Sequence, residues 1–160
     1  MSIEEDNTKS QHTGSIENTN EKEISAKVGK HVGVKRNLSI ELGNSKKHIR
    51  VGSLNVRGCK KEEKRKEIDE VLKSREVDIA ALQEVNTDGE LIDTKNYNWI
   101  VEREGQNKAR GLAVLIRKET GFEISRHRRI GKGAMLTYIT CKGELKIILM
   151  NVHGPNKKSI

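Results

Sequence analysis

Apolar residues follow a regular period only in the later part of the chain. Residues 1–46 are rich in Asn, Ser, Thr, Glu and Lys and show neither the helical nor the strand period. A segment of this kind buries too little apolar surface to offset the entropy lost on ordering. The pattern therefore predicts a disordered polar tail over 1–46 and one folded domain over 47–160.

The domain begins with a strand, a helix and a second strand. Residues 48–56, HIRVGSLNV, have the β-branched content of a strand, and Gly58 ends it. Residues 60–77 predict a helix, because apolar residues recur at i, i+3 and i+4 among Lys and Glu. Residues 77–82, VDIAAL, are typical of a strand that is covered on both faces. The apolar stripe of the helix consists of Ile68, Val71 and Leu72.

This order predicts a βαβ unit, in which the two strands are parallel and the connection is right-handed. The carboxyl ends of both strands then lie at the same edge of the sheet. Asn55 ends the first strand, and Gln83 with Glu84 ends the second. Ligands of open α/β sheets usually bind beyond that edge.

The rest of the domain predicts antiparallel strands. After a loop at 85–96, five short apolar segments are separated by Gly, Asn or charged turns, without a convincing helix between them. Together with the βαβ unit they predict a mixed sheet in a layered α/β chain. The five segments are 97–103, 111–118, 122–130, 134–141 and 145–152.

Composition limits the size of the hydrophobic core, and the net charge gives only a weak indication of which partners the protein binds. Hydrophobic residues make up 33% of the chain and four residues are aromatic, which allows a modest core. Residues 1–46 hold seven basic and seven acidic residues, so the net charge of +8 lies in 47–160. Such a surplus favours partners that carry phosphate, although a well-solvated surface explains it equally well.

Several classes of protein are disfavoured. The start MSIEEDNTKS is acidic and unlike a secretory signal, and no apolar stretch approaches the ~20 residues of a membrane span. Cys59 and Cys141 are too few for a disulfide scaffold and lack the spacing of a zinc site, so we expect two free thiols. We expect an intracellular protein, nuclear or cytoplasmic, that does not enter a membrane.

Candidate chemistry lies at the ends of apolar strands. A carboxylate such as Glu84, which directly follows a buried strand, needs a cation, a hydrogen-bond network or a raised pKa. One hard oxygen ligand beside a neutral amide, without a Cys/His cluster, favours Mg²⁺ with retained waters. Simpler interpretations stay open: Asn55 as a turn residue, Glu84 as an exposed partner of a Lys, and His153 as a turn cap beside Gly154 and Pro155.

Four segments carry a resemblance to a known family. VGSLNVRG, LQEVN, ARGLAVLIRK and LMNVHGPN, in this order, resemble the N-terminal half of the endonuclease/exonuclease/phosphatase superfamily, which includes DNase I-like and apurinic-site nucleases. The form is most similar to the endonuclease domains of LINE-type retrotransposons. The resemblance covers about residues 48–157.

The resemblance implies the N-terminal half of a four-layer α/β sandwich and Mg²⁺-dependent hydrolysis of phosphodiesters in DNA. Glu84 would be the metal ligand, and Asn55 would orient that carboxylate or the phosphate. His153 stands where many members carry a Tyr that contacts the scissile phosphate. The implied catalytic residues are Asn55, Glu84 and His153, and the implied substrate-binding residues are Asn55, Arg57, Asn151 and Asn156.

The chain also departs from the family. Neither the GD-x-N segment nor the terminal SDH segment is present, and no aspartate follows Asp93. Glu144 is a poor substitute for the missing general base, so we expect this chain alone to be inactive. The family's lipid and inositol phosphatases share the same motifs, which leaves the substrate open.

The alternative is a non-catalytic remnant that binds nucleic acid or protein. It would use the basic strips KKEEKRK, at 60–66, and RHRR, at 126–129, on phosphates. Half of a two-sheet sandwich leaves a sheet face and an edge strand without partners. We therefore expect that a second chain or a downstream segment completes the sandwich.

Overall fold

The computed structural model describes residues 36–42, 45–88, 90–104, 107–141 and 145–154. None of the helices within these ranges is long and apolar enough to cross a membrane. In chain order the elements are β1 Arg36–Leu42, β2 Ser45–Asn55, α1 Glu62–Ser74, β3 Ile79–Val85, β4 Leu91–Asp93, β5 Tyr97–Glu104, β6 Asn107–Arg117, the 3₁₀ helix η1 Lys118–Thr120, β7 Phe122–Ile130, β8 Ala134–Cys141 and β9 Leu145–Val152.

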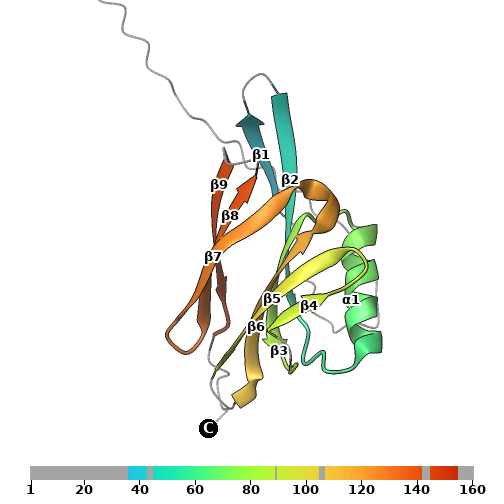
Figure 1. The fold of residues 1–160 in the computed structure, drawn as a ribbon, viewed down its shortest axis with the longest axis vertical. Helices are drawn as coiled ribbons and strands as arrows, with labels where there is room; N and C mark the ends of the chain where they lie inside the picture. The colour runs from blue at the N-terminus through green and yellow to red at the C-terminus, as the bar shows by residue number, and fades with distance from the viewer. Residues whose placement is uncertain (1–35, 43–44, 89, 105–106, 142–144, 155–160) are drawn as a thin grey trace, which may run out of the picture.

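The strands form two sheets. A large sheet has the order β1-β2-β3-β6-β5-β4, and a small sheet has the order β7-β8-β9. β2 and β3 are parallel, and every other pair is antiparallel. Figure 1 shows α1 on one side of the large sheet and the small sheet on the other, which gives three layers.

The predicted βαβ unit is confirmed. β2 and β3 pair in parallel from Val51↔Ile79 to Asn55↔Gln83. The α1 helix covers this pair with its buried stripe, which includes Ile68 and Leu72. Acidic residues in its first turn and a lysine in its last turn suit the helix dipole.

One buried acid of the helix was not expected from the stripe. Asp69 is 1% exposed and accepts hydrogen bonds from the Thr94 hydroxyl, from the Asn96 side-chain amide and, at 3.1 Å, from the Asn96 backbone N–H. These donors satisfy a carboxylate that would otherwise be costly to bury. Asp69 therefore fastens the turn between β4 and β5 to the helix.

The core lies on both faces of the large sheet. Trp99, Tyr97 and Leu115 belong to the cluster beneath α1, whereas Phe122 and Met135 belong to the cluster between the two sheets. β3 contributes Ala80 and Leu82 to the first cluster and Ile79 to the second. The prediction that this strand is covered on both faces is thus confirmed.

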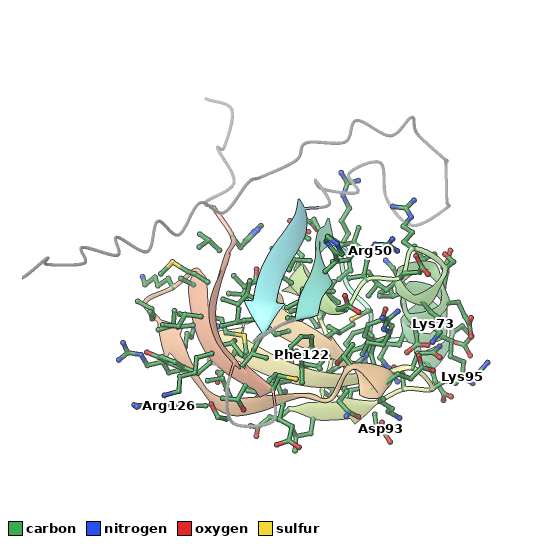
Figure 2. The ribbon with its side chains drawn as sticks, turned by 90° about the horizontal axis from the view of Figure 1, so that it is seen from above. Arg50, Lys73, Asp93, Lys95, Phe122 and Arg126 are labelled. Atoms are coloured by element: carbon green, nitrogen blue, oxygen red, sulfur yellow. The ribbon has the colours of Figure 1, made fainter. Side chains whose placement is uncertain are left out.

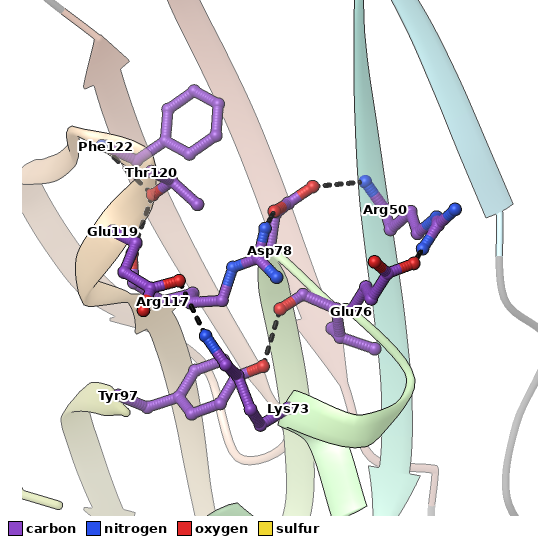
Figure 3. A network of polar contacts seen from close by, with 10 residues as sticks. Arg50, Lys73, Glu76, Asp78, Tyr97, Arg117, Glu119, Thr120 and Phe122 are labelled. Carbon is purple, nitrogen blue, oxygen red and sulfur yellow. Dashed lines mark hydrogen bonds and ion pairs between the residues drawn. The ribbon is translucent and has the colours of Figure 1, made fainter. Parts of the chain in front are cut away.

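A polar network closes the amino-terminal end of β3 (Figure 3). Asp78 accepts hydrogen bonds from the Arg117 guanidinium and, at 2.8 Å, from the Arg50 backbone N–H. The Tyr97 hydroxyl donates to the Val77 carbonyl at 2.6 Å. Burial raises the pKa of the Tyr97 phenol well above its usual value, so it remains a neutral donor.

Two predictions about local structure are corrected. The tail prediction is wrong for residues 36–42, which form β1, and for Ser45 and Lys46, which begin β2. Residues 1–35 lie outside the described residues. The loop predicted at 85–96 contains the short strand β4. In both cases a polar composition concealed an edge strand that is stabilised by main-chain pairing with a longer neighbour.

The described ranges form a mixed α/β structure with two sheets and one α-helix in three layers, and the N-terminal half of a four-layer sandwich stays a prediction. The outward face of the small sheet carries Ile148, Met150 and Val152, exposed at 64%, 58% and 56%. Figure 1 shows this face turned away from the large sheet, and none of the described elements covers it. The described molecule therefore presents an apolar stripe along β9 that a monomeric soluble surface usually avoids.

Candidate functional site

The ends of β2 and β3 bring Asn55 and Glu84 together. Asn55 Nδ2 donates a hydrogen bond to Glu84 Oε1 at 2.9 Å, although 29 positions separate the two residues in sequence. Asn55 Oδ1 accepts from the Arg57 backbone N–H at 3.1 Å, which turns the chain out of the strand. The Asn55 oxygen thus stabilises a turn, as one interpretation predicted, and its nitrogen is hydrogen-bonded to the Glu84 carboxylate.

Glu84 lies in a β-bulge. The pairing of β3 with β6 shifts between Gln83 and Val85, and Glu84 itself has φ of 55°. A non-glycine residue in this left-handed region is strained, and such strain concentrates at functional sites. The Glu84 carbonyl accepts from the Gly58 N–H at 2.7 Å, so the loop after β2 holds the bulge in place.

His153 reaches the same carboxylate from the small sheet. Its Nε2 lies 3.8 Å from Glu84 Oε1, and the His153 and Glu84 side chains are 15% and 26% exposed. Its backbone N–H donates to the Gly133 carbonyl, in the turn between β7 and β8, at 2.8 Å. A Cβ on Gly133 would lie 2.6 Å from the His153 carbonyl oxygen, so this close approach requires glycine.

Asn151 is buried between the two sheets. Its side chain is 1% exposed, and Nδ2 donates to the carbonyls of Leu82 and Ala113 at 2.8 and 3.0 Å. Its Oδ1 accepts from Gln83 Nε2 at 2.7 Å. The substrate contact that the resemblance implied for Asn151 would require it to leave this position.

The other implied substrate-binding residues differ in place. Arg57 is exposed directly after Asn55, with φ of 48°, at the edge that carries Glu84. Asn156 lies outside the described residues. Of the predicted site, the structure therefore brings together Asn55, Glu84 and His153, with Arg57 on the adjoining surface. We call the first three residues the candidate site.

The basic strip 60–66 is divided between structure and surface. Lys64 Nζ donates to the Val56 carbonyl at 2.6 Å, and Arg65 Nη1 donates to the Cys59 carbonyl at 3.0 Å. These two cations satisfy carbonyl groups of the loop that follows β2. Lys60 and Lys61 are exposed on the same loop, and Lys60 Nζ lies 3.9 Å from Asp88 Oδ2.

The strip RHRR does not form one continuous patch. Arg126 and Arg128 pair with the outward-facing positions of β8, and Figure 2 shows Arg126 projecting on the side of the small sheet. His127 Nε2 lies 3.2 Å from Glu102 Oε1 of the large sheet. Arg129 donates to two carbonyls of its own turn at 3.1 and 2.9 Å. Alternation along β7 thus sends neighbouring residues to opposite faces.

The donor set suits a cation that is held mainly by water and phosphate. Glu84 supplies one carboxylate and Asn55 a neutral amide, and Mg²⁺ commonly binds through one or two carboxylates together with substrate oxygens. Groups of three or more His, Cys, Asp or Glu that could hold a metal do not occur within the described ranges. Glu84 is therefore the one carboxylate of the candidate site that could hold a cation, and both polar atoms of the Asn55 amide already make hydrogen bonds.

Both cysteines are free thiols, as predicted, and both are buried. Burial raises the pKa of Cys59 from 9.0 to about 11, and nearby Arg65 and Lys64 oppose this only in part. As the pH rises, the Cys59 thiol ionises at a lower pH in the unfolded chain than in the folded protein. The free energy of unfolding therefore falls as the pH rises from about 9 to about 11.

We expect Cys59 to lower the free energy of unfolding by about 1.4 kcal/mol per pH unit within that window. Denaturant unfolding at pH 8, 9, 10 and 11 measures the slope for the natural chain and for Cys59→Ala. The variant should lose this component of the slope, whereas Cys141→Ala should keep it. Equal slopes for the natural chain and Cys59→Ala would show that the Cys59 thiol is not shielded.

Three residues of this region were not singled out by their chemistry. Gln83 joins the sheets through Asn151, Gly111 faces the bulge, and Gly133 admits the His153 backbone. A glycine inside an apolar strand, as in ARGLAV, is the one signal in the sequence that indicates a bulge or a close backbone approach.

A search of the chain against models of known protein families gives no match.

Proposed function

We propose that the chain carries a Mg²⁺-dependent phosphodiester-cleaving site for DNA at the carboxyl ends of β2, β3 and β9. One observation carries the proposal most strongly. A carboxylate, Glu84, is oriented by Asn55 at 2.9 Å and approached by His153 at 3.8 Å, although His153 comes from the other sheet. Convergent polar groups of this kind, at such an edge, are the usual basis of a ligand site.

Each residue has a distinct role in this proposal. Glu84 would hold Mg²⁺, which supplies charge stabilisation to the phosphate in the transition state. Asn55 fixes the orientation of that carboxylate through one of its two oxygens. His153 would donate a hydrogen bond to a phosphate oxygen. Arg57, exposed beside them, supplies positive charge for a flanking phosphate.

Within the described part of the chain, no second carboxylate joins Glu84 and His153 to act as general base. No aspartate follows Asp93 in the sequence, and Glu84 already has the role of metal ligand. A general base contributes roughly 10²–10⁴-fold to a rate. The sequence led us to expect an inactive chain; we propose instead that slow residual cleavage of DNA remains, reduced by about that factor, because Glu84 and Asn55 are still paired.

The second candidate function is binding of nucleic acid without cleavage. The net charge of +8 and the exposed cations Arg57, Lys60 and Lys61 of the loop after β2 favour it. Contacts of this kind release counterions from the phosphates, so the affinity would fall steeply with salt. Binding of this type requires neither Glu84 nor Mg²⁺.

Nicking of supercoiled plasmid separates the two functions. We expect slow residual Mg²⁺-dependent nicking by the natural chain and a further loss of about 10²-fold or more in Glu84→Gln, because a neutral amide oxygen binds Mg²⁺ far more weakly than a carboxylate. Glu90→Gln, which alters an exposed glutamate on the loop after β3, is the matched control and should retain activity. Salt-sensitive binding that is equal in the presence of Mg²⁺ and of EDTA, without nicking, would reject the enzyme and leave the second candidate.

A further inference from the structure

We infer that Asn151 is a positioning residue, which holds His153 beside Glu84 without contacting a substrate itself. The effect of this positioning on cleavage rests on the proposed function, because both concern the same site. Its evidence is the hydrogen bonding of a side chain that is 1% exposed.

Asn151 bonds one sheet to two strands of the other. It belongs to β9 of the small sheet, and its Nδ2 donates to Leu82 in β3 at 2.8 Å and to Ala113 in β6 at 3.0 Å. Leu82 and Ala113 are cross-strand neighbours. Because buried carbonyls without a donor are costly, this fork determines where the end of β9 lies on the large sheet.

Gln83 completes the attachment. Its Nε2 donates to Asn151 Oδ1 at 2.7 Å and to Ser53 Oγ at 3.2 Å. Leu82 and Gln83 are the two residues directly before Glu84, so Asn151 is bonded to the segment that enters the bulge. The position of Asn151 and the position of the Glu84 backbone are therefore coupled.

His153 follows Asn151 by two residues. Positions i and i+2 of an extended chain lie on the same face, so the side chain of His153 is directed toward the large sheet, as Asn151 is. The His153 backbone N–H donates a hydrogen bond to the Gly133 carbonyl at 2.8 Å. The Nε2 atom of His153 then lies 3.8 Å from Glu84 Oε1. The Asn151 fork and the Gly133 bond together determine this distance.

The test measures the contact between His153 and Glu84 without any need for catalysis. Ring resonances of His153, assigned by comparison with His153→Gln, are recorded by NMR in the full chain. In the natural background Glu84→Gln should shift them, because a charge 3.8 Å away is removed. In the Asn151→Ala background the same change should shift them much less.

Thr137→Val is the matched control. Thr137 is fully buried on β8 between the sheets, as Asn151 is on β9, and its hydroxyl oxygen has no hydrogen-bond partner within the described residues. A role limited to packing between the sheets would make both variants weaken the response. If Asn151 positions His153, the His153 resonances in the Thr137→Val background should still shift on Glu84→Gln as they do in the natural chain.

A second variant covers the case in which Asn151→Ala does not fold. Gln83→Met removes the 2.7 Å bond to Asn151 Oδ1 and keeps the Asn151 fork, and we expect a reduced response. If Asn151→Ala folds and the His153 resonances still shift fully on Glu84→Gln, the inference is overturned. If Asn151→Ala does not fold, a full shift in Gln83→Met overturns it. A lost response supports it even where the natural chain does not nick DNA, an outcome that rejects the proposed enzyme alone.

Discussion

Gly111→Ala is expected to lower the free energy of unfolding by roughly 3 kcal/mol or more, because it forces two paired strands apart. A Cβ at position 111 would lie 2.0 Å from the Val85 carbonyl oxygen. Both groups are backbone of the β3–β6 pair, so no flexible side chain can yield. Val85 directly follows the bulge, and its displacement should also disturb the contact of Glu84 with Asn55.

Denaturant unfolding followed by circular dichroism measures this loss. Gly154→Ala is the control, because a Cβ there would meet nothing within 4 Å. We expect the control to change the free energy of unfolding by less than about 0.5 kcal/mol. Similar values for the two variants would mean that β3 and β6 do not approach each other as closely at the bulge as the structure has them.

Asp78→Ala is expected to cost about 3–5 kcal/mol, the usual penalty for removing one partner of a buried ion pair. The side chains of Asp78 and Arg117 are 9% and 20% exposed, so the guanidinium would lose its partner in a poorly solvated place. The Arg50 backbone N–H would also lose its acceptor at 2.8 Å. Figure 3 shows Asp78 between these two donors.

Thermal and urea unfolding of two further variants test the cause. Glu119→Gln breaks an exposed pair with Lys73 in the same region and should cost much less than Asp78→Ala, because solvent screens that pair. The double variant Asp78→Ala with Arg117→Leu should recover part of the loss, since no unpaired charge remains. A double variant less stable than Asp78→Ala would contradict this explanation.

Local periodicity was enough to predict the βαβ unit. The apolar run 77–82 and the helical stripe of Ile68 and Leu72 both reflect contacts between neighbours in sequence, and both are buried as expected. The five later strands were also predicted from their segments, and all of them lie in antiparallel pairs. The period of apolar residues along each of these segments predicts a strand or a helix whichever element packs against it.

Edge strands and layers were harder to predict. β1 has an alternating sequence, RNLSIEL, within a polar segment, and its strand becomes evident only through its pairing with β2. The division into two sheets depends on the turn at η1 and Gly121, where φ is 72°. Five consecutive strand patterns fit one sheet or two equally well, because alternation does not specify the partner of each face.

By itself the sequence determined that Asn55 and Glu84 share one edge, because parallel strands joined by a helix place their carboxyl ends together. The family resemblance implied that His153 belongs to the same site, but only the tertiary structure showed its side chain beside Glu84 and Asn151 buried between the sheets. His153 is 69 positions from Glu84, and no period relates the two residues. Their approach arises from packing of one sheet on the other, through the hydrogen bonds of Asn151 to β3 and β6.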